Sequence, residues 1–572
     1  MRNLILLLVL FGLNSCTGFG FSKNSIDPKK DSVFVNKQYK SEVNIKDFTS
    51  TGKTYYFIKL WGFLKYNADF DNVDIDWDDY FITNISKVNL MNEQQYRAFI
   101  SNTLLRFPKP VNKEIKNNIK DYSLIDNDWF NTTYFDDKTS KELFYMFENR
   151  EIKNSKFISN HRIGNLIFNN EKKYDENDYP AENLRILSLA RYWNIINYFF
   201  VYKNDINENW DKVLLDFIPK FINSKNTSEY HLAVQELSSK LYDCHSMVRS
   251  EHLDNKVFGR YTPNFRISYI DTIFVISKIR TEKYNNRQLN VGDIILKIND
   301  TPIKERYDQL NKIFKGANPP SERRIICPYL CSSTKDKMEL TILRNGEQKQ
   351  IVIELRDYWD YQEEENRIAS IFEKELLAKE ISSGVYYLSL DNLSKSNLQM
   401  NLDKVKDATN LILDLRSGIN DPVIKDMANF ILPKESDFFM NTYSDVNHPG
   451  LLRIGSSYKL GKDDGNYFKG NVYVLVNENT QSSAEFSTMA FQMNPKTTVV
   501  GSQTAGSDGN IAMFHFPGNI QTVFTGIGIY YPDMSPTQRI GVKIDHNVKP
   551  TIKGISNGKD EILEKCISLI IE

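Results

Sequence analysis

Ser482 lies at the turn between an apolar run and a helical segment, where a serine hydroxyl can act as a nucleophile. Residues 471–476 are typical of a strand buried on both faces, and residues 482–492 have the pattern of a helix. The first N–H groups of a helix have no acceptor within it. They can therefore hold an oxyanion while the hydroxyl attacks a carbonyl. The same pattern also fits a simple N-cap, with Glu485 completing a capping box.

The elements around this turn have an α/β pattern and must position Ser482. From about residue 380 onward, apolar runs that are typical of buried strands alternate with helical segments, and the chain closes with an amphipathic helix at 561–571. The apolar runs are 385–390, 411–415, 472–476 and 497–500. We therefore expect residues 359–572 to form an α/β domain, with Ser482 just beyond the end of one strand.

A small β domain is predicted over residues 256–358. Short β-rich runs precede the turn Gly292-Asp293, and an Asn345-Gly346 turn joins two further strands. This pattern resembles a PDZ domain, which binds extended peptide ends by adding a strand to its sheet edge. An unrelated small β domain is the alternative interpretation.

A helical unit occurs twice in the N-terminal half of the chain. The segment Leu60-Trp-Gly-Phe-Leu-Lys-Tyr66 with Asp76-Trp-Asp78 recurs as Tyr192-Trp-Asn-Ile-Ile-Asn-Tyr198 with Asn209-Trp-Asp211. Both copies have the apolar spacing of helices, so we predict a duplicated unit in which the tryptophans are core anchors. The first copy falls within residues 46–180, a domain of unknown role, and the second within the helical segment 181–255.

The N-terminus has the features of a bacterial export signal. Arg2 precedes an apolar stretch, 4–13, that is too short to span a bilayer, and Leu13-Asn-Ser-Cys16 resembles the lipobox of bacterial lipoproteins. In that family the cysteine is lipidated and becomes the first residue. We therefore expect a signal peptide at 1–16, a polar tether at 17–45, and a protein anchored through Cys16 in the cell envelope, at the periplasmic or outer-membrane face. A cleaved signal peptide with a coincidental cysteine is the alternative.

Composition and charge narrow the class of protein. The chain has 572 residues, too many for one hydrophobic core, and its formal charge of −1 gives no reason to expect nucleic acid as a partner. The sequence has no Gly-rich phosphate loop and no dense His/Asp/Glu cluster, so we predict neither a metal nor an organic cofactor. Four cysteines remain after Cys16, and an exported chain permits disulfides between them. Cys327 and Cys331 are the only pair close in sequence. For Cys244 and Cys566, free thiols are as plausible as a disulfide.

Taken in order, the motifs make the chain similar to the C-terminal processing, or tail-specific, peptidases. Members of this family are serine peptidases with a PDZ domain ahead of a crotonase-like α/β catalytic domain. The resemblance covers roughly residues 180–570. It rests on Trp193 with Tyr198, Asp243-Cys-His245, the Gly292-Asp293 turn, Leu411-Ile-Leu-Asp-Leu-Arg416, Thr480-Gln-Ser-Ser-Ala-Glu485, Gly501-Ser-Gln-Thr-Ala-Gly506 and Gly541-Val-Lys-Ile-Asp545.

The resemblance implies a nucleophile and two oxyanion donors. The family nucleophile lies three residues before the glutamate of the serine-rich motif, which is Ser482 in this chain. The N–H of Ser483 is expected to be one donor. Gly418, in the turn that follows the apolar run 411–415, is expected to supply the other.

The base decides the branch of the family. Many relatives use a lysine in a Thr-x-Gly-Lys-Gly turn, but Ser507 stands at that position here, and a serine hydroxyl cannot replace a base. The other branch, which resembles the tricorn core protease, uses a histidine at the end of the helical segment, and His245 fits. In that branch a serine and a carboxylate orient the imidazole. The matching residues are Cys244 and Gln538, which we expect to stabilise the imidazolium less.

The sequence thus predicts a multidomain α+β protein with a helical N-terminal region, a PDZ-like β domain and a crotonase-like α/β catalytic domain. We expect a serine-type endopeptidase that cleaves peptide bonds of exported proteins or peptides through an acyl-enzyme. Its partners would be a peptide or unfolded-protein substrate and a membrane reached through the lipid anchor. A catalytically weak or inactive peptide-binding lipoprotein of the same fold is the alternative.

Overall fold

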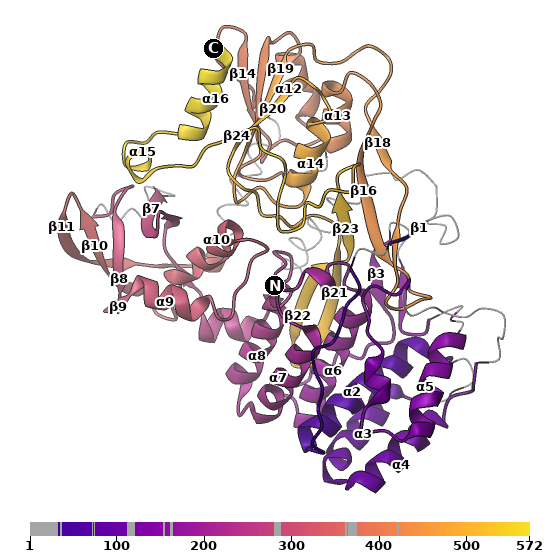
Figure 1. The fold of residues 1–572 in the computed structure, drawn as a ribbon. Coiled ribbons are helices and arrows are strands. Elements are labelled where there is room, and N and C mark those ends of the chain that lie inside the picture. Colours follow the sequence, from indigo (N-terminus) through magenta and orange to yellow (C-terminus); the bar gives the residue numbers. More distant parts are fainter. Residues whose placement is uncertain are drawn as a thin grey trace.

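The chain folds as a multidomain α+β protein with a helical N-terminal region (Figure 1). The computed structural model describes residues 32–34, 37–70, 73, 75–110, 121–150, 152, 155–160, 164–279, 288–360, 363, 375–419 and 423–572. The predicted signal peptide, Cys16 and most of the predicted tether lie outside these residues. None of the helices in the described part of the chain has the length and apolarity that crossing a bilayer requires.

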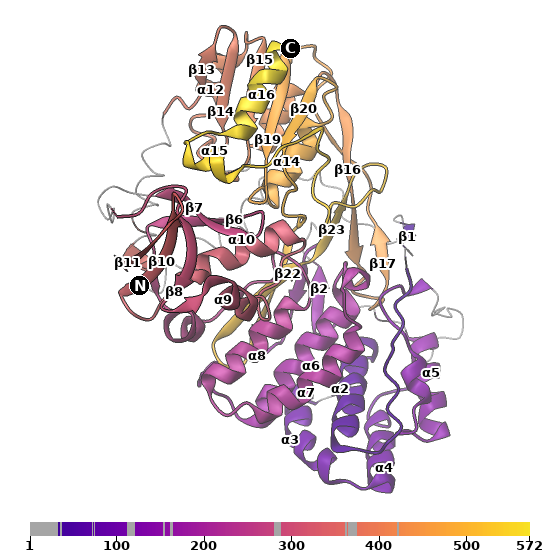
Figure 2. The same cartoon turned by 60° about the vertical axis from the view of Figure 1, so that its left-hand side comes forward.

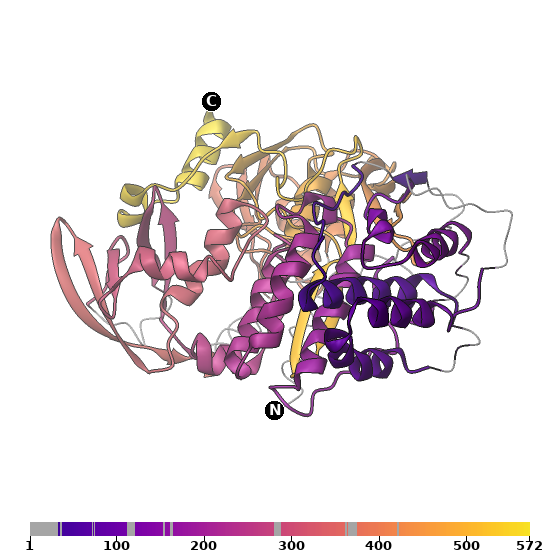
Figure 3. The ribbon, with the colours of Figure 1, turned by 60° about the horizontal axis from the view of Figure 1, so that its bottom comes forward.

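The duplicated helical unit predicted from the sequence is present. Each copy has three helices: α2 (Ser50–Asn67), α3 (Trp77–Leu90) and α4 (Glu93–Leu104) in the first, and α6 (Glu182–Phe199), α7 (Trp210–Asn223) and α8 (Thr227–Ser239) in the second. Figure 3 shows the indigo and magenta helices side by side.

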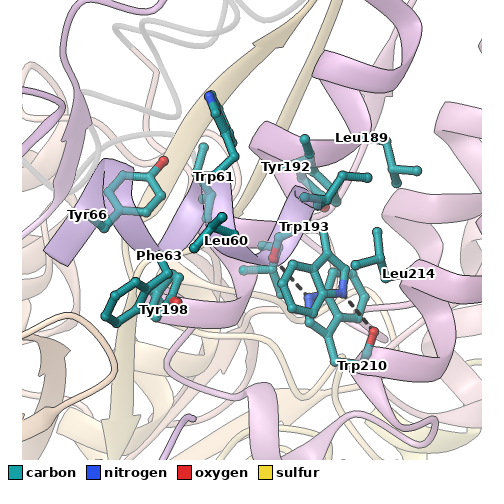
Figure 4. Packing of buried hydrophobic residues seen from close by; sticks show 14 of the residues in the cluster. Leu60, Trp61, Phe63, Tyr66, Leu189, Tyr192, Trp193, Tyr198, Trp210 and Leu214 are labelled. Carbon is teal, nitrogen blue, oxygen red and sulfur yellow. Dashed lines mark hydrogen bonds between the residues drawn. The ribbon is translucent and has the colours of Figure 1, made fainter. Parts of the chain in front are cut away.

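A reciprocal pair of tryptophans closes each copy. The indole N–H groups of Trp61 and Trp77 donate to each other's main-chain carbonyls at 2.9 and 3.0 Å. Those of Trp193 and Trp210 do the same at 2.8 and 3.0 Å (Figure 4). All four side chains are buried, so they are core anchors, as predicted.

The two copies bind each other through exchanged charge pairs. Lys59 of the first copy pairs with Asp211 of the second, and Arg191 of the second pairs with Asp78 of the first. Lys59 and Arg191 each stand two residues before the first tryptophan of their copy, and the two aspartates directly follow the second tryptophan. Equivalent residues thus exchange partners across the contact, as they do about a twofold axis.

Helices α2 and α6 approach closely where this approximate axis passes. A Cβ atom on Gly62 of α2 would lie 1.9 Å from the Cγ of Asn194 on α6, so only glycine fits at this point. The amide of Asn194 donates to the carbonyl of Ile58 at 3.1 Å. Gly62 and Asn194 each directly follow the first tryptophan of their copy. Equivalent positions of the two copies therefore meet here, as they do at a twofold axis.

The β domain is a mostly antiparallel sheet with two helices. Its strand order is β11-β10-β8-β7-β6, with β9 beside β8, and α10 packs against the edge strand β6. The elements are β6 (Phe265–Ile270), β7 (Ile273–Ile279), β8 (Ile294–Ile298), β9 (Thr301–Pro302), α9 (Ile303–Leu310), α10 (Pro319–Leu330), β10 (Lys337–Arg344) and β11 (Glu347–Glu354). Figure 2 shows this domain beside both the helical region and the α/β domain.

The α/β domain has a sheet of order β13-β14-β15-β19-β20-β24, parallel from β14 to β24. Its strands are β13 (Lys379–Ser382), β14 (Val385–Ser389), β15 (Asn410–Asp414), β19 (Asn471–Val476), β20 (Thr497–Gly501) and β24 (His546–Asn547), and its helices are α12 (Leu398–Val405), α13 (Ile424–Ile431), α14 (Ser483–Phe491), α15 (Ile552–Ser556) and α16 (Glu561–Ile571). The loops that carry Gly418, Ser482 and Ser507 follow β15, β19 and β20, so they meet at the carboxyl edge of the sheet.

A hairpin of the α/β domain enters the helical region. Strand β22 (Ile520–Thr525) pairs with β21 (Ile511–Phe516) and with β4 (Val248–Arg249), which begins three residues after His245. The buried side chains of Phe514 and Phe524 belong to the same hydrophobic cluster as the helical unit. The hairpin therefore joins the segment that carries His245 to the α/β domain.

The remaining elements connect these parts. They are β1 (Ser32–Phe34), η2 (Asp128–Asn131), α5 (Asp137–Asn149), β2 (Ile158–Asn160), β3 (Leu166–Phe168), η3 (Lys203–Asp205), the π-helical turn η4 (Leu253–Val257), β5 (Tyr261–Thr262), β12 (Arg356–Asp357), β16 (Ser436–Ser444), β17 (Leu452–Ile454), β18 (Tyr458–Leu460) and β23 (Ile527–Tyr530).

Part of the predicted tether is ordered: β1 pairs with β17, and the buried Tyr39 donates its hydroxyl to Asp211 at 2.9 Å. The four cysteines among the described residues are buried free thiols.

The exchanged charge pair gives a stability prediction. We expect Lys59→Met to lower the free energy of unfolding by about 3 kcal/mol, because it leaves the buried carboxylate of Asp211 without its ammonium partner. Lys212→Met, in the exposed pair with Asp216, should change it by less than about 1 kcal/mol. Urea unfolding followed by tryptophan fluorescence checks both. Equal midpoints for the two variants would contradict the importance of the buried pair.

Candidate active site

Ser482 occupies the sharp turn between β19 and α14, with a backbone conformation that serine rarely adopts. Its φ is 55° and its ψ is −119°, and it is the N-cap residue of α14. A side chain at positive φ is strained, and such strain collects at functional sites. The N–H of Ser482 donates to the carbonyl of Ser507 at 3.1 Å and to Glu485 Oε2 at 3.3 Å.

The carboxylate of Glu485 holds the neighbouring loop in place. It is completely buried, and besides Ser482 it accepts from Thr504 Oγ1 at 2.5 Å and from the N–H groups of Gly506 and Ser507 at 2.8 and 3.0 Å. Burial raises the pKa of Glu485, and these hydrogen bonds oppose the increase. Loop 504–507 is therefore fixed beside the first turn of α14.

His245 presents one ring nitrogen to hydroxyl groups. Nδ1 lies 2.8 Å from Thr525 Oγ1 and 3.2 Å from Ser507 Oγ, whereas Nε2 has no hydrogen-bond partner among the described residues. The residue is 8% exposed. Burial lowers its pKa, the carboxylate of Asp243 acts in the opposite direction, and Arg324 adds to the decrease. His245 is thus a neutral imidazole near neutral pH, with Nε2 available.

Asp243 and Thr525 were not among the site residues predicted from the sequence, although Asp243 belongs to the motif that supplied His245. The carboxylate of Asp243 is buried and accepts from Ser507 Oγ at 2.6 Å, from the N–H of His245 at 3.0 Å and from the N–H of Thr525 at 2.7 Å. Its Oδ1 lies 3.6 Å from Nδ1 of His245. Thr525 ends strand β22, far from any motif, so no local signal pointed to it.

The two residues predicted to orient the imidazole make no hydrogen bond to it. The Cys244 thiol accepts from the N–H of Ala317 at 3.3 Å and lies 3.6 Å from the carbonyl of Ala505, and burial raises its pKa. Gln538 is 5% exposed, and its Oε1 has no partner among the described residues. The structure therefore brings Ser507 and Asp243, rather than Cys244 and Gln538, to the ring.

The predicted oxyanion donors differ in availability. Ser483 is the first residue of α14, so its N–H has no acceptor within the helix. Gly418 has a φ of 93°, but its N–H donates to the carbonyl of Leu415 at 3.2 Å. The turn must change conformation before this N–H reaches an oxyanion. Thr480 Oγ1 also donates to that carbonyl, at 3.1 Å, and so ties the two loops together.

The β domain touches the site through the start of α10. The side-chain amide of Asn318 donates to the carbonyls of Thr504 and Ala505 at 2.8 and 3.1 Å, and Arg324 donates to the side chain of Gln481, which directly precedes Ser482. The β domain is thus attached to the loops on either side of the nucleophile position.

Comparisons with known proteins find a family match in the α/β domain. Residues 384–548 match the model of peptidase family S41. No curated protein matches the chain in sequence. Among solved structures, mature CPAF is similar, with a TM-score of 0.53 and 14% identity over 68% of this chain and 97% of that one. Mature CPAF complexed with lactacystin has a TM-score of 0.52 and 14% identity, with coverages of 68% and 98%.

The photosystem II D1 C-terminal processing protease also matches, with a TM-score of 0.38 and 14% identity over 66% of this chain and 98% of that one. At such identities the likeness to mature CPAF shows the fold. Residues 384–548, which include Ser482 and Ser507, thus match peptidase family S41, in agreement with the serine-type peptidase predicted from the ordered motifs.

Proposed function

We propose that the protein is a serine endopeptidase that cleaves peptide bonds of exported proteins or peptides, with Ser482 as nucleophile and His245 as base. The observation that supports it most is the position of Ser507. Its carbonyl accepts the N–H of Ser482, and its hydroxyl lies against the ring of His245. One residue thus links the strained serine to the imidazole, whose Nε2 remains available.

In the proposed reaction the hydroxyl of Ser482 attacks the scissile carbonyl while Nε2 of His245 takes its proton. The N–H of Ser483, joined by that of Gly418 once its turn has opened, stabilises the oxyanion. His245 returns the proton to the leaving amine as the peptide bond breaks. Water then hydrolyses the acyl-enzyme by the same two proton transfers, which frees the acid product and regenerates the hydroxyl.

We further propose that the β domain is PDZ-like and that the α/β domain is crotonase-like. Among the described residues, β6 pairs only with β7, so its other edge is available to an extended peptide beside α10. Strand addition uses main-chain hydrogen bonds and therefore gives loose selectivity. Because α10 also contacts Gln481, a peptide bound here would lie near the nucleophile.

The lipid anchor at Cys16 remains a proposal that rests on the sequence motif, as does the location in the cell envelope. The chain from Cys16 to β1 spans 16 residues, which extend to at most about 55 Å. An anchored peptidase would therefore work close to the membrane surface.

The first prediction concerns the two catalytic residues. Ser482→Ala and His245→Ala should each lower kcat/KM at least about a thousandfold, and the double variant should be hardly worse, because the two act as one unit. A serine-directed fluorophosphonate should label the parent chain but not Ser482→Ala. If the folded parent takes no label, the inactive peptide-binding alternative holds. If His245→Ala keeps most of the activity, another residue is the base.

The pH dependence follows from the environment of His245. Burial lowers its pKa, so the imidazole stays neutral, and competent as a base, to a pH below the ordinary histidine value of about 6.5. We expect kcat/KM to be constant through neutrality and to fall on the acid side below that value. An alkaline limb, with activity rising well above pH 8, would instead indicate a lysine base.

The strain at Ser482 gives a stability prediction. Ser482→Gly and Ser482→Ala should both be inactive, but the glycine variant should be more stable by about 1 kcal/mol, because glycine adopts positive φ without a Cβ clash. Thermal unfolding of the two variants measures the difference. A glycine variant no more stable than the alanine variant would show that the turn is unstrained.

Peptide binding to the β6 edge is tested by N-methylation. In an added strand, alternate peptide N–H groups point to β6, so methylating those should weaken binding at least about tenfold, whereas methylating the intervening ones should change it little. Isothermal titration with the Ser482→Ala chain avoids cleavage. Equal losses at successive positions would exclude strand addition.

A further inference from the structure

We propose that Asp243, acting through the hydroxyl of Ser507, is the positioning group that keeps His245 in the tautomer with an unprotonated Nε2. This inference rests on the proposed function, because it assumes that His245 is the base. It gives roles to two residues that the sequence motifs left without one: the aspartate of the Asp-Cys-His motif and the serine that stands in place of a lysine.

The direction of each hydrogen bond follows from the carboxylate. An ionised carboxylate only accepts, so the proton of the Ser507 hydroxyl points to Asp243 Oδ1 at 2.6 Å. The oxygen of Ser507 then faces Nδ1 of His245, 3.2 Å away, with its lone pairs. This arrangement favours a ring proton on Nδ1, which Ser507 Oγ and Thr525 Oγ1, the latter at 2.8 Å, can both accept, and it leaves Nε2 as the acceptor that the reaction needs.

Asp243 is itself held in one orientation by backbone groups. Oδ1 also accepts the N–H of His245 at 3.0 Å, and Oδ2 accepts the N–H of Thr525 at 2.7 Å. The side chain is buried, so these donors replace water. One N–H comes from the histidine loop and the other from the end of β22. The carboxylate thus joins the two segments that enclose the ring.

The charge of Asp243 also matters when the imidazole takes a proton. Two charged groups act on the ring: Asp243, whose Oδ1 is 3.6 Å from Nδ1, and Arg324 of α10. Burial and Arg324 both disfavour the imidazolium, and the carboxylate opposes them. Asp243 is thus the anion, among the described residues, that balances the positive charge formed on His245 as Ser482 is deprotonated.

Gln538 and Cys244 match the positions that orient the histidine in the branch resembling the tricorn core protease, but here neither of them holds the imidazole. Gln538 makes no hydrogen bond to the ring, and the thiol of Cys244 is directed to Ala317 and Ala505. The positive charge is therefore balanced from within the histidine motif rather than from the segment before Gly541.

The experiment measures how fast a fluorophosphonate inactivates the full chain between pH 4 and pH 9, which requires no knowledge of the natural substrate. Ser507→Ala should lower the rate constant about ten- to a hundredfold. Asp243→Asn should lower it about a thousandfold or more, because its amide can donate to Ser507 and reverse the tautomer. Loss of the anion should also move the acid limb of the Asp243→Asn profile to lower pH.

Ser246→Ala is the matched control. Its hydroxyl is buried in the same loop and donates to the carbonyl of Asp243 at 2.8 Å, but it touches neither the carboxylate nor the ring. It should leave the acid limb in place. If Asp243→Asn does not fold, Ser507→Ala carries the test.

Two results would overturn the proposal. In the first, the inactivation rates and acid limbs of Asp243→Asn and Ser507→Ala are the same as those of Ser246→Ala. In the second, Gln538→Ala is the one variant that moves the acid limb. Failure of the proposed function gives a different result: either the fluorophosphonate does not label the parent chain, or it still labels Ser482→Ala.

Discussion

The buried carboxylate of Glu485 is the interaction on which the site depends. Its four donors come from Ser482, the proposed nucleophile, and from loop 504–507, so one side chain fixes both the strained turn and the loop that carries Ser507. Burying a carboxylate away from water costs free energy unless its oxygens accept hydrogen bonds, and here main-chain N–H groups donate most of these bonds. The half of the predicted capping box in which Glu485 accepts from the N–H of Ser482 is thus present together with the site, and the two interpretations do not exclude each other.

The second constraint is that the proposed base, His245, comes from a different part of the chain than the proposed nucleophile, Ser482. His245 follows the second helical copy, and Ser482 follows strand β19 of the α/β domain. The β21–β22 hairpin joins them, because β22 pairs with β4 and ends at Thr525, which contacts both Asp243 and His245. The first helical copy supports the position of His245 indirectly, through helix α6 of the second copy. Helix α6 is buried over nearly its whole length, and the exchanged pairs hold the first copy against it.

The sequence predicted the parts that local pattern controls. The apolar runs located the parallel strands, the tryptophan spacing located the duplicated helices, and the motif around Glu485 located the turn at Ser482. It did not predict the surroundings of His245. Thr525 reaches the ring only because a hairpin enters another domain, and no spacing in the sequence encodes that path. The roles expected for Cys244 and Gln538 came from matching positions in relatives, and matching positions do not fix where a side chain points.

The residue at position 507 bears on the choice between the proposed histidine base and a lysine base in this chain. A lysine there would place an ammonium group beside Asp243, where the two charges would pair. The carboxylate would then no longer accept from a hydroxyl, and the added positive charge would oppose protonation of His245. A serine at this position instead carries no charge and transmits the orientation of Asp243 to the ring. In the proposed mechanism, a serine rather than a lysine at position 507 is therefore what allows Asp243 to act on His245.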